Sequence, residues 1–149
     1  MESVRSDGYL VTDDQERLDL VQIHRWLSDE SSWATGRSMD LVEKSIRGSI
    51  TLGCFAPDGV PVGVSRLVTD GATFAWLCDV FVNNDFRGKG LGRFLVQSAV
   101  THPEVKDLDR ILLATGDAHE LYRKFGFTSL AEPQRWMELR SSNPPPAAT

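Results

Sequence analysis

The spacing of apolar residues along the chain predicts a sheet accompanied by helices. Within residues 15–27, Leu20, Ile23 and Leu27 recur at helical spacing and form one apolar stripe, which is typical of an amphipathic helix. Residues 60–69 alternate between apolar and polar side chains, which indicates a strand with one buried face. The expected strands are residues 8–12, 49–56, 60–69, 72–83, 109–115, 127–130 and 134–140. The expected helices are residues 15–27, 39–47, 93–101 and 117–125.

Two kinds of connection indicate how these strands pair. Asp58-Gly59 and Asp70-Gly71 are tight-turn sequences, so we expect the strands around them to form antiparallel hairpins. The run Ile111-Leu112-Leu113-Ala114 is apolar throughout, which suits a strand buried on both faces beside a parallel neighbour. The helix that precedes this strand then forms a right-handed crossover. The pattern predicts a mixed α/β sheet.

The composition is that of one globular domain. The chain has 149 residues, of which 41% are hydrophobic and 25% are charged, so a core can form without disulfides or metals. We expect a single domain over residues 1–140, followed by a disordered tail at residues 141–149, where three prolines are consecutive. A net charge of −5 argues against nucleic acid as the main partner, because phosphate binding needs a broad basic face.

Export and membrane insertion are not predicted. No apolar run approaches the roughly 20 residues that a membrane span requires. The first residues lack the basic start and apolar region of a signal peptide. Cys54 and Cys78 both lie in apolar, strand-like runs, and we expect buried thiols rather than a disulfide. These features predict a cytoplasmic protein.

Candidate chemistry is concentrated between Asp79 and Gly92. An apolar strand runs into a loop with a glycine at every second position, and a helix follows directly. The first amides of a helix have no intrahelical partner and carry partial positive charge, and glycine lets an anion approach the backbone closely. The cations of the loop are Arg87, Lys89 and Arg93. No acidic residue occurs between Asp85 and Glu104, so we expect an anion site here.

The spacing of the loop residues narrows the kind of anion. The sequence lacks the Gly-Lys-Ser/Thr of a Walker loop, and Arg93 stands where a dinucleotide fingerprint needs its third glycine. Arg87, Gly90 and Gly92 instead fit the pattern R-x-x-G-x-G. This pattern resembles the pyrophosphate-binding motif of the GNAT acetyltransferase superfamily, which binds acetyl-CoA. The simpler interpretation is a glycine-rich connection with solvated charges.

A second motif strengthens this resemblance. Residues 121–127, Leu-Tyr-Arg-Lys-Phe-Gly-Phe, look like the second GNAT signature, a helix that ends in L-Y-x-x-x-G-F. The order of the expected elements also matches, so the resemblance covers residues 9–140 and points to small stand-alone bacterial-type members. It implies a central, mostly antiparallel twisted sheet of six to seven strands with about four flanking helices. One strand pair is expected to splay apart at the CoA site.

The resemblance also implies roles for individual residues. The backbone of Phe81 and Val82 is expected to pair with pantetheine and the thioester carbonyl. The loop residues expected to hold the pyrophosphate are Arg87, Gly88, Lys89, Gly90, Leu91 and Gly92. Tyr122 is the implied general acid for the departing CoA thiolate. Thr115 stands where the family often has a CoA-contacting Asn, and Asn84 stands where it often has Pro, so we expect retuned cofactor contacts.

The acceptor side of the reaction is less specified. Asp79 is the acidic residue inside the central apolar strand, and it is either the general base or a structural carboxylate that holds a neighbouring loop or arginine. Trp33 and Arg37 lie in a polar loop and either contact the acceptor or serve as a core-edge plug and a solvated cation. Arg37 would suit an acceptor that carries a carboxylate.

The leading hypothesis is an acetyl-CoA-dependent N-acetyltransferase. It would transfer the acetyl group directly to a primary amine of a small molecule or peptide in a ternary complex. The alternative is a non-catalytic CoA-binding regulatory or interaction module of the same fold. A homodimer through strands near the C-terminus is left open, and neither nucleic acid nor membrane is an expected partner.

Overall fold

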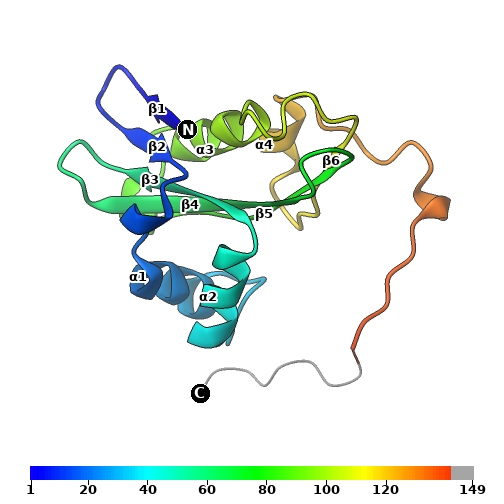
Figure 1. Cartoon of the computed structure of the whole chain (residues 1–149), viewed down its shortest axis with the longest axis horizontal. Helices are drawn as coiled ribbons and strands as arrows, with labels where there is room; N and C mark the ends of the chain where they lie inside the picture. Colours follow the sequence, from blue (N-terminus) through cyan, green and yellow to red (C-terminus); the bar gives the residue numbers. More distant parts are fainter. Residues whose placement is uncertain (142–149) are drawn as a thin grey trace.

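The computed structural model describes residues 1–141, in which six strands form one sheet in the order of the sequence (Figure 1). The strands are β1 (Glu2–Val4), β2 (Leu10–Thr12), β3 (Ile50–Phe55), β4 (Pro61–Thr69), β5 (Ala75–Val82) and β6 (Ile111–Leu112). The α-helices are α1 (Leu20–Arg25), α2 (Met39–Arg47), α3 (Leu91–Val100) and α4 (His119–Arg123). Helices α3 and α4 cover one face of the sheet, and α1 and α2 cover the other (Figure 1). The mixed α/β fold is thereby confirmed.

The sheet is incomplete along one edge of β5. Neighbouring strands from β1 to β5 are antiparallel, whereas β5 and β6 are parallel. The parallel pair is short, since it joins only Ala75 to Ile111 and Trp76 to Leu112. Within the part of the chain that is described, residues 77–82 of β5 pair with β4 alone. One backbone edge of β5 is therefore open over most of its length.

The two layers of helices bury two separate apolar clusters. The cluster under α3 includes Leu52, Leu67, Leu77, Leu95 and Val96. The cluster under α1 and α2 includes Ile23, Trp26, Val42, Ile46, Val64 and Phe81. Adjacent residues of β5, such as Val80 and Phe81, pack into different clusters because side chains alternate across a strand. A change on β5 can therefore affect both faces of the sheet.

The helix expected at residues 15–27 is divided. Asp14 accepts a hydrogen bond from the Glu16 amide and starts a short 3-10 helix, η1 (Gln15–Arg17). Asp19 accepts one from the Gln22 amide and starts α1. The chain then continues as a π-helical turn, η2 (Trp26–Glu30). The two N-caps, Asp14 and Asp19, therefore divide the segment that apolar spacing predicted as one helix.

The two ends of the chain differ from the expectation. Residues 2–4, which lie outside the expected strands, form β1, which is held by pairing with β2 and by an ion pair of 2.7 Å between the N-terminal amine and Asp13. The strand expected at 109–115 is reduced to β6. The strands expected at 127–130 and 134–140 are wrong, because the structure gives these residues no strand pairing and places a 3-10 turn, η4 (Pro133–Arg135), across the start of the second segment. Apart from Ser141, the expected tail lies outside the described residues.

The helices within residues 1–141 are too short or too polar to cross a bilayer.

Candidate active site

A bulge in β5 shapes the centre of the sheet. The antiparallel register between β4 and β5 shifts where Asp79 and Val80 lie opposite the single residue Ser65. Asp79 takes up the bulge with a φ of 53°, a conformation that few residues other than glycine adopt. Bulges and such backbone conformations are common beside active sites because they redirect a side chain. Here the redirected side chain is the Asp79 carboxylate.

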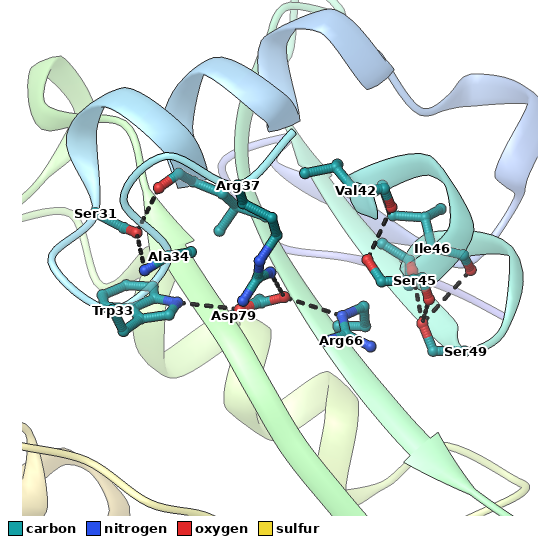
Figure 2. Close-up of polar contacts among 12 residues, drawn as sticks. Ser31, Trp33, Ala34, Arg37, Val42, Ser45, Ile46, Ser49, Arg66 and Asp79 are labelled. Carbon is teal, nitrogen blue, oxygen red and sulfur yellow. Dashed lines mark hydrogen bonds and ion pairs between the residues drawn. The ribbon is translucent and has the colours of Figure 1, made fainter. Parts of the chain in front are cut away.

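Three donors, two from the loop before α2 and one from β4, surround this carboxylate (Figure 2). Arg37 donates to Oδ2 through Nη1 at 2.8 Å, and Arg66 of β4 donates to the same oxygen through Nε at 2.9 Å. Trp33 donates to Oδ1 through its indole N–H at 3.0 Å. Asp79 itself is only 6% exposed. Its two oxygens are thus engaged by protein groups.

The electrostatics keep Asp79 ionised. Burial alone would raise the pKa of the carboxyl group, but the charges of Arg37 and then Arg66, together with their hydrogen bonds, outweigh it and hold the pKa below its usual range. A carboxylate with a lowered pKa and occupied oxygens is a weak proton acceptor. The geometry therefore favours the structural role for Asp79 over that of general base.

What Asp79 holds is the loop between α1 and α2. The loop carries both Trp33 and Arg37, and His24 of α1 adds a contact of 2.9 Å between its Nε2 and the Arg37 carbonyl. Trp33 is 52% exposed and lies against Phe81, with 6.3 Å between the ring centroids. Trp33 is thus neither a buried plug nor an isolated surface residue. Its indole presents an aromatic face to solvent directly above the bulge.

The glycine loop lies at the end of β5. After the short helix η3 (Asn84–Phe86), Gly88 and Gly90 have φ values of 81° and 75°, and Gly90 is the N-cap of α3. No side chain caps this end of α3, so its first amides remain available to a ligand. A Cβ at Gly92 would come no closer than 3.9 Å to the Leu121 side chain, which leaves the surface over the first turn open. This is the geometry of an anion site.

Two arginines connect the glycine loop to other parts of the chain. Arg87 folds back, with its guanidinium 5.6 Å from the centre of the Phe81 ring and its Nε donating to the Val82 carbonyl at 3.3 Å. Arg5, in the β1–β2 hairpin, donates to the Lys89 carbonyl at 2.9 Å and stacks on Phe94 of α3. The loop is therefore tied to the central strand and to the start of the chain.

The direction of the backbone groups at the end of β5 follows from one hydrogen bond. Asn83 donates its backbone N–H to the Val62 carbonyl at 2.8 Å. Alternation in an antiparallel pair then turns the backbone groups of Phe81 toward β4 and those of Val82 toward the open edge. Of the two residues expected to contact the thioester, Val82 is the one whose amide faces outward.

Tyr122 is buried on α4, in the apolar cluster under α3. Its ring packs edge-on against Phe127 at 5.9 Å and lines a cavity of about 260 Å³ together with Thr115 and His119. Burial raises the pKa of the Tyr122 hydroxyl, so this group keeps its proton at neutral pH. Thr115 accepts a hydrogen bond from the Ala118 amide at 3.0 Å and so helps to start α4.

Sequence reasoning missed Arg66 and Arg5. Arg66 is the cation of β4, and its opposite charge on a strand adjacent to Asp79 was a usable signal, since such pairs recur across strands. Arg5 had no comparable signal, because its partner Lys89 is 84 residues away. Only the folded hairpin brings the two together.

Comparisons with known proteins identify relatives of this fold. Residues 20–127 match the profile described as the Acetyltransferase (GNAT) family. A solved structure from Xanthomonas campestris pv. campestris, described as an acetyltransferase of the GNAT family, is 39% identical, with a TM-score of 0.87 over 93% of this chain and 96% of that chain. A protein of Gibberella zeae named as an acetyltransferase is 28% identical over an aligned length of 137. The match covers 78% of this chain and 76% of that protein.

Another solved structure of the same fold contains a ligand. This structure from Mycobacterium tuberculosis, in complex with CoA, is 18% identical, with a TM-score of 0.67 over 80% of this chain and 72% of that chain, and it shows a shared fold. The family profile covers well over half of the sequence, including both the glycine loop and the tyrosine helix. The chain therefore belongs to the GNAT family of acetyltransferases, whose co-substrate is acetyl-CoA.

Proposed function

We propose that this protein is an N-acetyltransferase that transfers the acetyl group of acetyl-CoA directly to a primary amine. The observation that carries the proposal is that the uncapped start of α3, the unpaired edge of β5 and the buried Tyr122 belong to elements that share one apolar cluster. An anion site, a row of backbone donors and a protonated hydroxyl thus lie on neighbouring elements. Direct transfer needs no covalent intermediate, since holding both substrates together supplies much of the acceleration.

The glycine loop would hold the pyrophosphate. The open amides at the start of α3 supply hydrogen-bond donors, and the residues proposed to contribute are Arg87, Gly88, Lys89, Gly90, Leu91 and Gly92. The positive φ of Gly88 and Gly90 lets the loop wrap an anion without a side chain in the way. Arg5, which holds the Lys89 carbonyl from behind, would keep these amides pointed outward.

The thioester would lie along β5. Val82 presents its amide to the open edge and can donate to the thioester carbonyl, where negative charge develops during transfer. Phe81 would contribute through its ring, which lies between Trp33 and Arg87. Tyr122 would give its proton to the departing thiolate, a role that requires the protonated hydroxyl that burial favours. Thr115 would support Tyr122 by starting α4 and lining the same cavity.

The acceptor would bind against the loop that carries Trp33 and Arg37. Arg37 and Arg66 together carry one positive charge more than Asp79 neutralises, which favours an amine that also carries a carboxylate. The exposed face of Trp33 can cover the apolar part of a small molecule or peptide. In this proposal Asp79 positions the acceptor loop, and the amine loses its proton to water.

The protein is further proposed to work in the cytoplasm and as a homodimer. Both cysteines are unpaired, which fits a reducing compartment.

Calorimetric titration tests the cofactor, with NAD and ATP as controls for nonspecific anion binding. Acetyl-CoA alone should bind in the micromolar range. Gly92→Leu should weaken this binding at least tenfold, because a side chain there covers the open first turn of α3. Gly48→Leu, at the end of α2 and far from the loop, is the matched control. Equal affinity of both variants for acetyl-CoA would show that the glycine loop is not part of the cofactor site.

Thiol release over a panel of amines then tests catalysis. Amino acids and short peptides should release CoA faster than polyamines, since only the former carry a carboxylate. Tight cofactor binding with no release above the rate of spontaneous hydrolysis across the panel would support the alternative, a non-catalytic CoA-binding module.

A further inference from the structure

The sheet face that carries the Asp79 carboxylate continues beyond α1 and α2. Val68 of β4 and Trp76 of β5 are each 37% exposed, although both lie within strands. Their neighbours Leu67 and Leu77 are buried in the cluster under α3, so side-chain alternation turns Val68 and Trp76 to the opposite face. The helices α1 and α2 lie on that face, but they leave this end of the sheet uncovered (Figure 1).

Val68 and Trp76 form one apolar surface. They lie directly opposite each other in the antiparallel register between β4 and β5. Cross-strand partners of this kind have Cβ atoms about 5 Å apart, so the two side chains present a joint surface to solvent. An indole offers a large and rigid contact area with few rotatable bonds. We call this pair the apolar platform.

The apolar platform lies next to the charged cluster around Asp79. The adjacent residue pair along the two strands, on the same face, is Arg66 and Cys78. Arg66 donates to the Asp79 carboxylate at 2.9 Å, and Cys78 has a small side chain. Since two residues along a strand span about 7 Å, the platform begins roughly 7 Å from the backbone position of this pair.

The two arginines of the charged cluster have donors left for a second anion. A guanidinium has five N–H donors, and within residues 1–141 Asp79 engages one donor of Arg37 and one of Arg66. The two arginine side chains keep 21% and 15% of their surface exposed. A carboxylate matches the planar guanidinium well. A molecule with a carboxylate and an apolar group a few bonds apart would therefore contact both the arginines and the platform.

We propose that the acceptor is an α-amino acid with a large apolar side chain, and that Trp76 and Val68 select this side chain. The inference rests on the proposed function, because the amine must reach a thioester beside Val82. The three substituents of an amino acid leave one carbon, and β5 offers their partners in order. These are the open edge at Val82 for the amine, the arginines around Asp79 for the carboxylate and the platform for the side chain.

The platform discriminates between side chains by burial. A polar side chain placed there would lose contact with water without gaining a hydrogen bond. The methyl group of alanine is too short to cover the indole of Trp76. Since each buried methylene contributes about tenfold or more to discrimination in a closed pocket, we expect at least about tenfold preference on this open surface for phenylalanine over alanine.

Thiol release with three amines is the first test. L-Alanine lacks the apolar ring of L-phenylalanine, and 2-phenylethylamine lacks its carboxylate, so both should have a kcat/KM at least about tenfold lower. Trp76→Ala should bring the ratio of L-phenylalanine to L-alanine within about threefold, and Trp76→Phe should restore most of the preference. Trp136→Ala, which alters a tryptophan 43% exposed and located after η4, is the matched control and should leave the ratio unchanged.

The indole N–H signals of the four tryptophans report binding independently of catalysis. They can be assigned in nuclear magnetic resonance spectra from single Trp→Phe variants. With CoA in place of acetyl-CoA no transfer can occur, and L-phenylalanine should then shift the signals of Trp76 and Trp33. The signals of Trp26, which is 1% exposed, and of Trp136 should stay in place as internal controls.

The outcomes separate this inference from the proposed function. Equal kcat/KM for L-phenylalanine and L-alanine, or a preference that survives Trp76→Ala or falls equally in Trp136→Ala, would overturn the inference and leave acetyl transfer standing. A shifted Trp76 signal without thiol release from any amine would support the platform and overturn acetyl transfer. If L-phenylalanine at about 10 mM, well above usual KM values, leaves the Trp76 signal in place, the inference is overturned as well. Circular dichroism should show Trp76→Ala folded, since this side chain is partly exposed.

Discussion

Replacing Asp79 by Asn separates a positioning role from a proton-accepting one. Asparagine has nearly the same size and also tolerates a positive φ, so it can keep the bulge at φ 53° while losing the negative charge. Arg37 and Arg66 would then lie close together with no carboxylate between them. We therefore expect a lower free energy of unfolding and greater mobility of the loop that carries Trp33 and Arg37.

The size of the loss follows from the burial of the three groups. Removing one partner of a buried ion pair costs about 3–5 kcal/mol of unfolding free energy. The side chains of Arg37 and Arg66 keep 21% and 15% exposure, so water can partly rehydrate them after the change. We therefore expect a loss of about 2–3 kcal/mol, which for a domain of this size lowers Tm by roughly 6–10 °C.

The loss should depend on pH with a definite sign. The pKa of Asp79 is lower in the folded protein than the ordinary value of 3.8, so its charge stabilises the fold fully above pH 3.8. This contribution disappears as pH falls through the lower folded pKa. The difference in unfolding free energy between wild type and Asp79→Asn should be constant from pH 7 to about pH 5 and shrink below pH 4.

Urea unfolding at several pH values measures this difference, with Asp29→Asn, an exposed aspartate on η2, as the control. Steady-state kinetics then distinguish the two roles. A positioning role predicts a higher KM for the amine, an unchanged KM for acetyl-CoA and only a modest fall in kcat. A stable Asp79→Asn protein whose kcat falls more than about a hundredfold at pH 7 and recovers at alkaline pH would refute the reasoning and restore Asp79 as the base.

Two further substitutions test the cofactor side. Tyr122→Phe keeps the packing on Phe127 and should lower kcat by about a hundredfold or more while the Kd for acetyl-CoA stays within twofold; an unchanged kcat from pH 6 to 9 would exclude Tyr122 as the acid. Arg5→Gln removes the hydrogen bond to the Lys89 carbonyl and the stacking on Phe94, so calorimetry should show roughly fivefold weaker CoA binding, about 1 kcal/mol. Arg25→Gln, an exposed arginine on α1, should leave this affinity unchanged, and an equal loss in both variants would contradict the assignment.

Features that depend on neighbouring residues could be predicted from the sequence. Helix α2 begins at Met39 as expected because Ser38 accepts a hydrogen bond from the Leu41 amide, a purely local interaction. The hairpin after β4 also follows local rules, since Asp70 accepts hydrogen bonds from the amides of Ala72 and Thr73. The glycine loop was recognisable for the same reason, as its conformation depends on its own glycines.

Features that depend on distant partners could not be predicted in the same way. The role of Asp79 is decided by Trp33 and Arg37, more than 40 residues earlier, and by a bulge that apolar alternation does not reveal. The segment 134–140 has the alternation of a strand, and the structure nevertheless leaves it unpaired. Periodicity shows that a segment is suited to a strand, but it does not show which edge will receive it.

The arrangement of β5 suits the proposed function, in which one strand serves two substrates. The bulge at Asp79 turns a carboxylate toward the loop of Trp33 and Arg37 on one face of the sheet, while Val82, three residues further, turns its amide to the open edge. At about 3.3 Å per residue these two points are roughly 10 Å apart, a distance that an acyl group and an amine can span. Phe81 lies between them, in contact with Trp33 of the proposed acceptor loop and with Arg87 of the glycine loop. In the proposed function, a displacement of the loop of Trp33 and Arg37 would shift the Phe81 ring and with it Arg87, so we expect binding of the amine and of acetyl-CoA to be coupled.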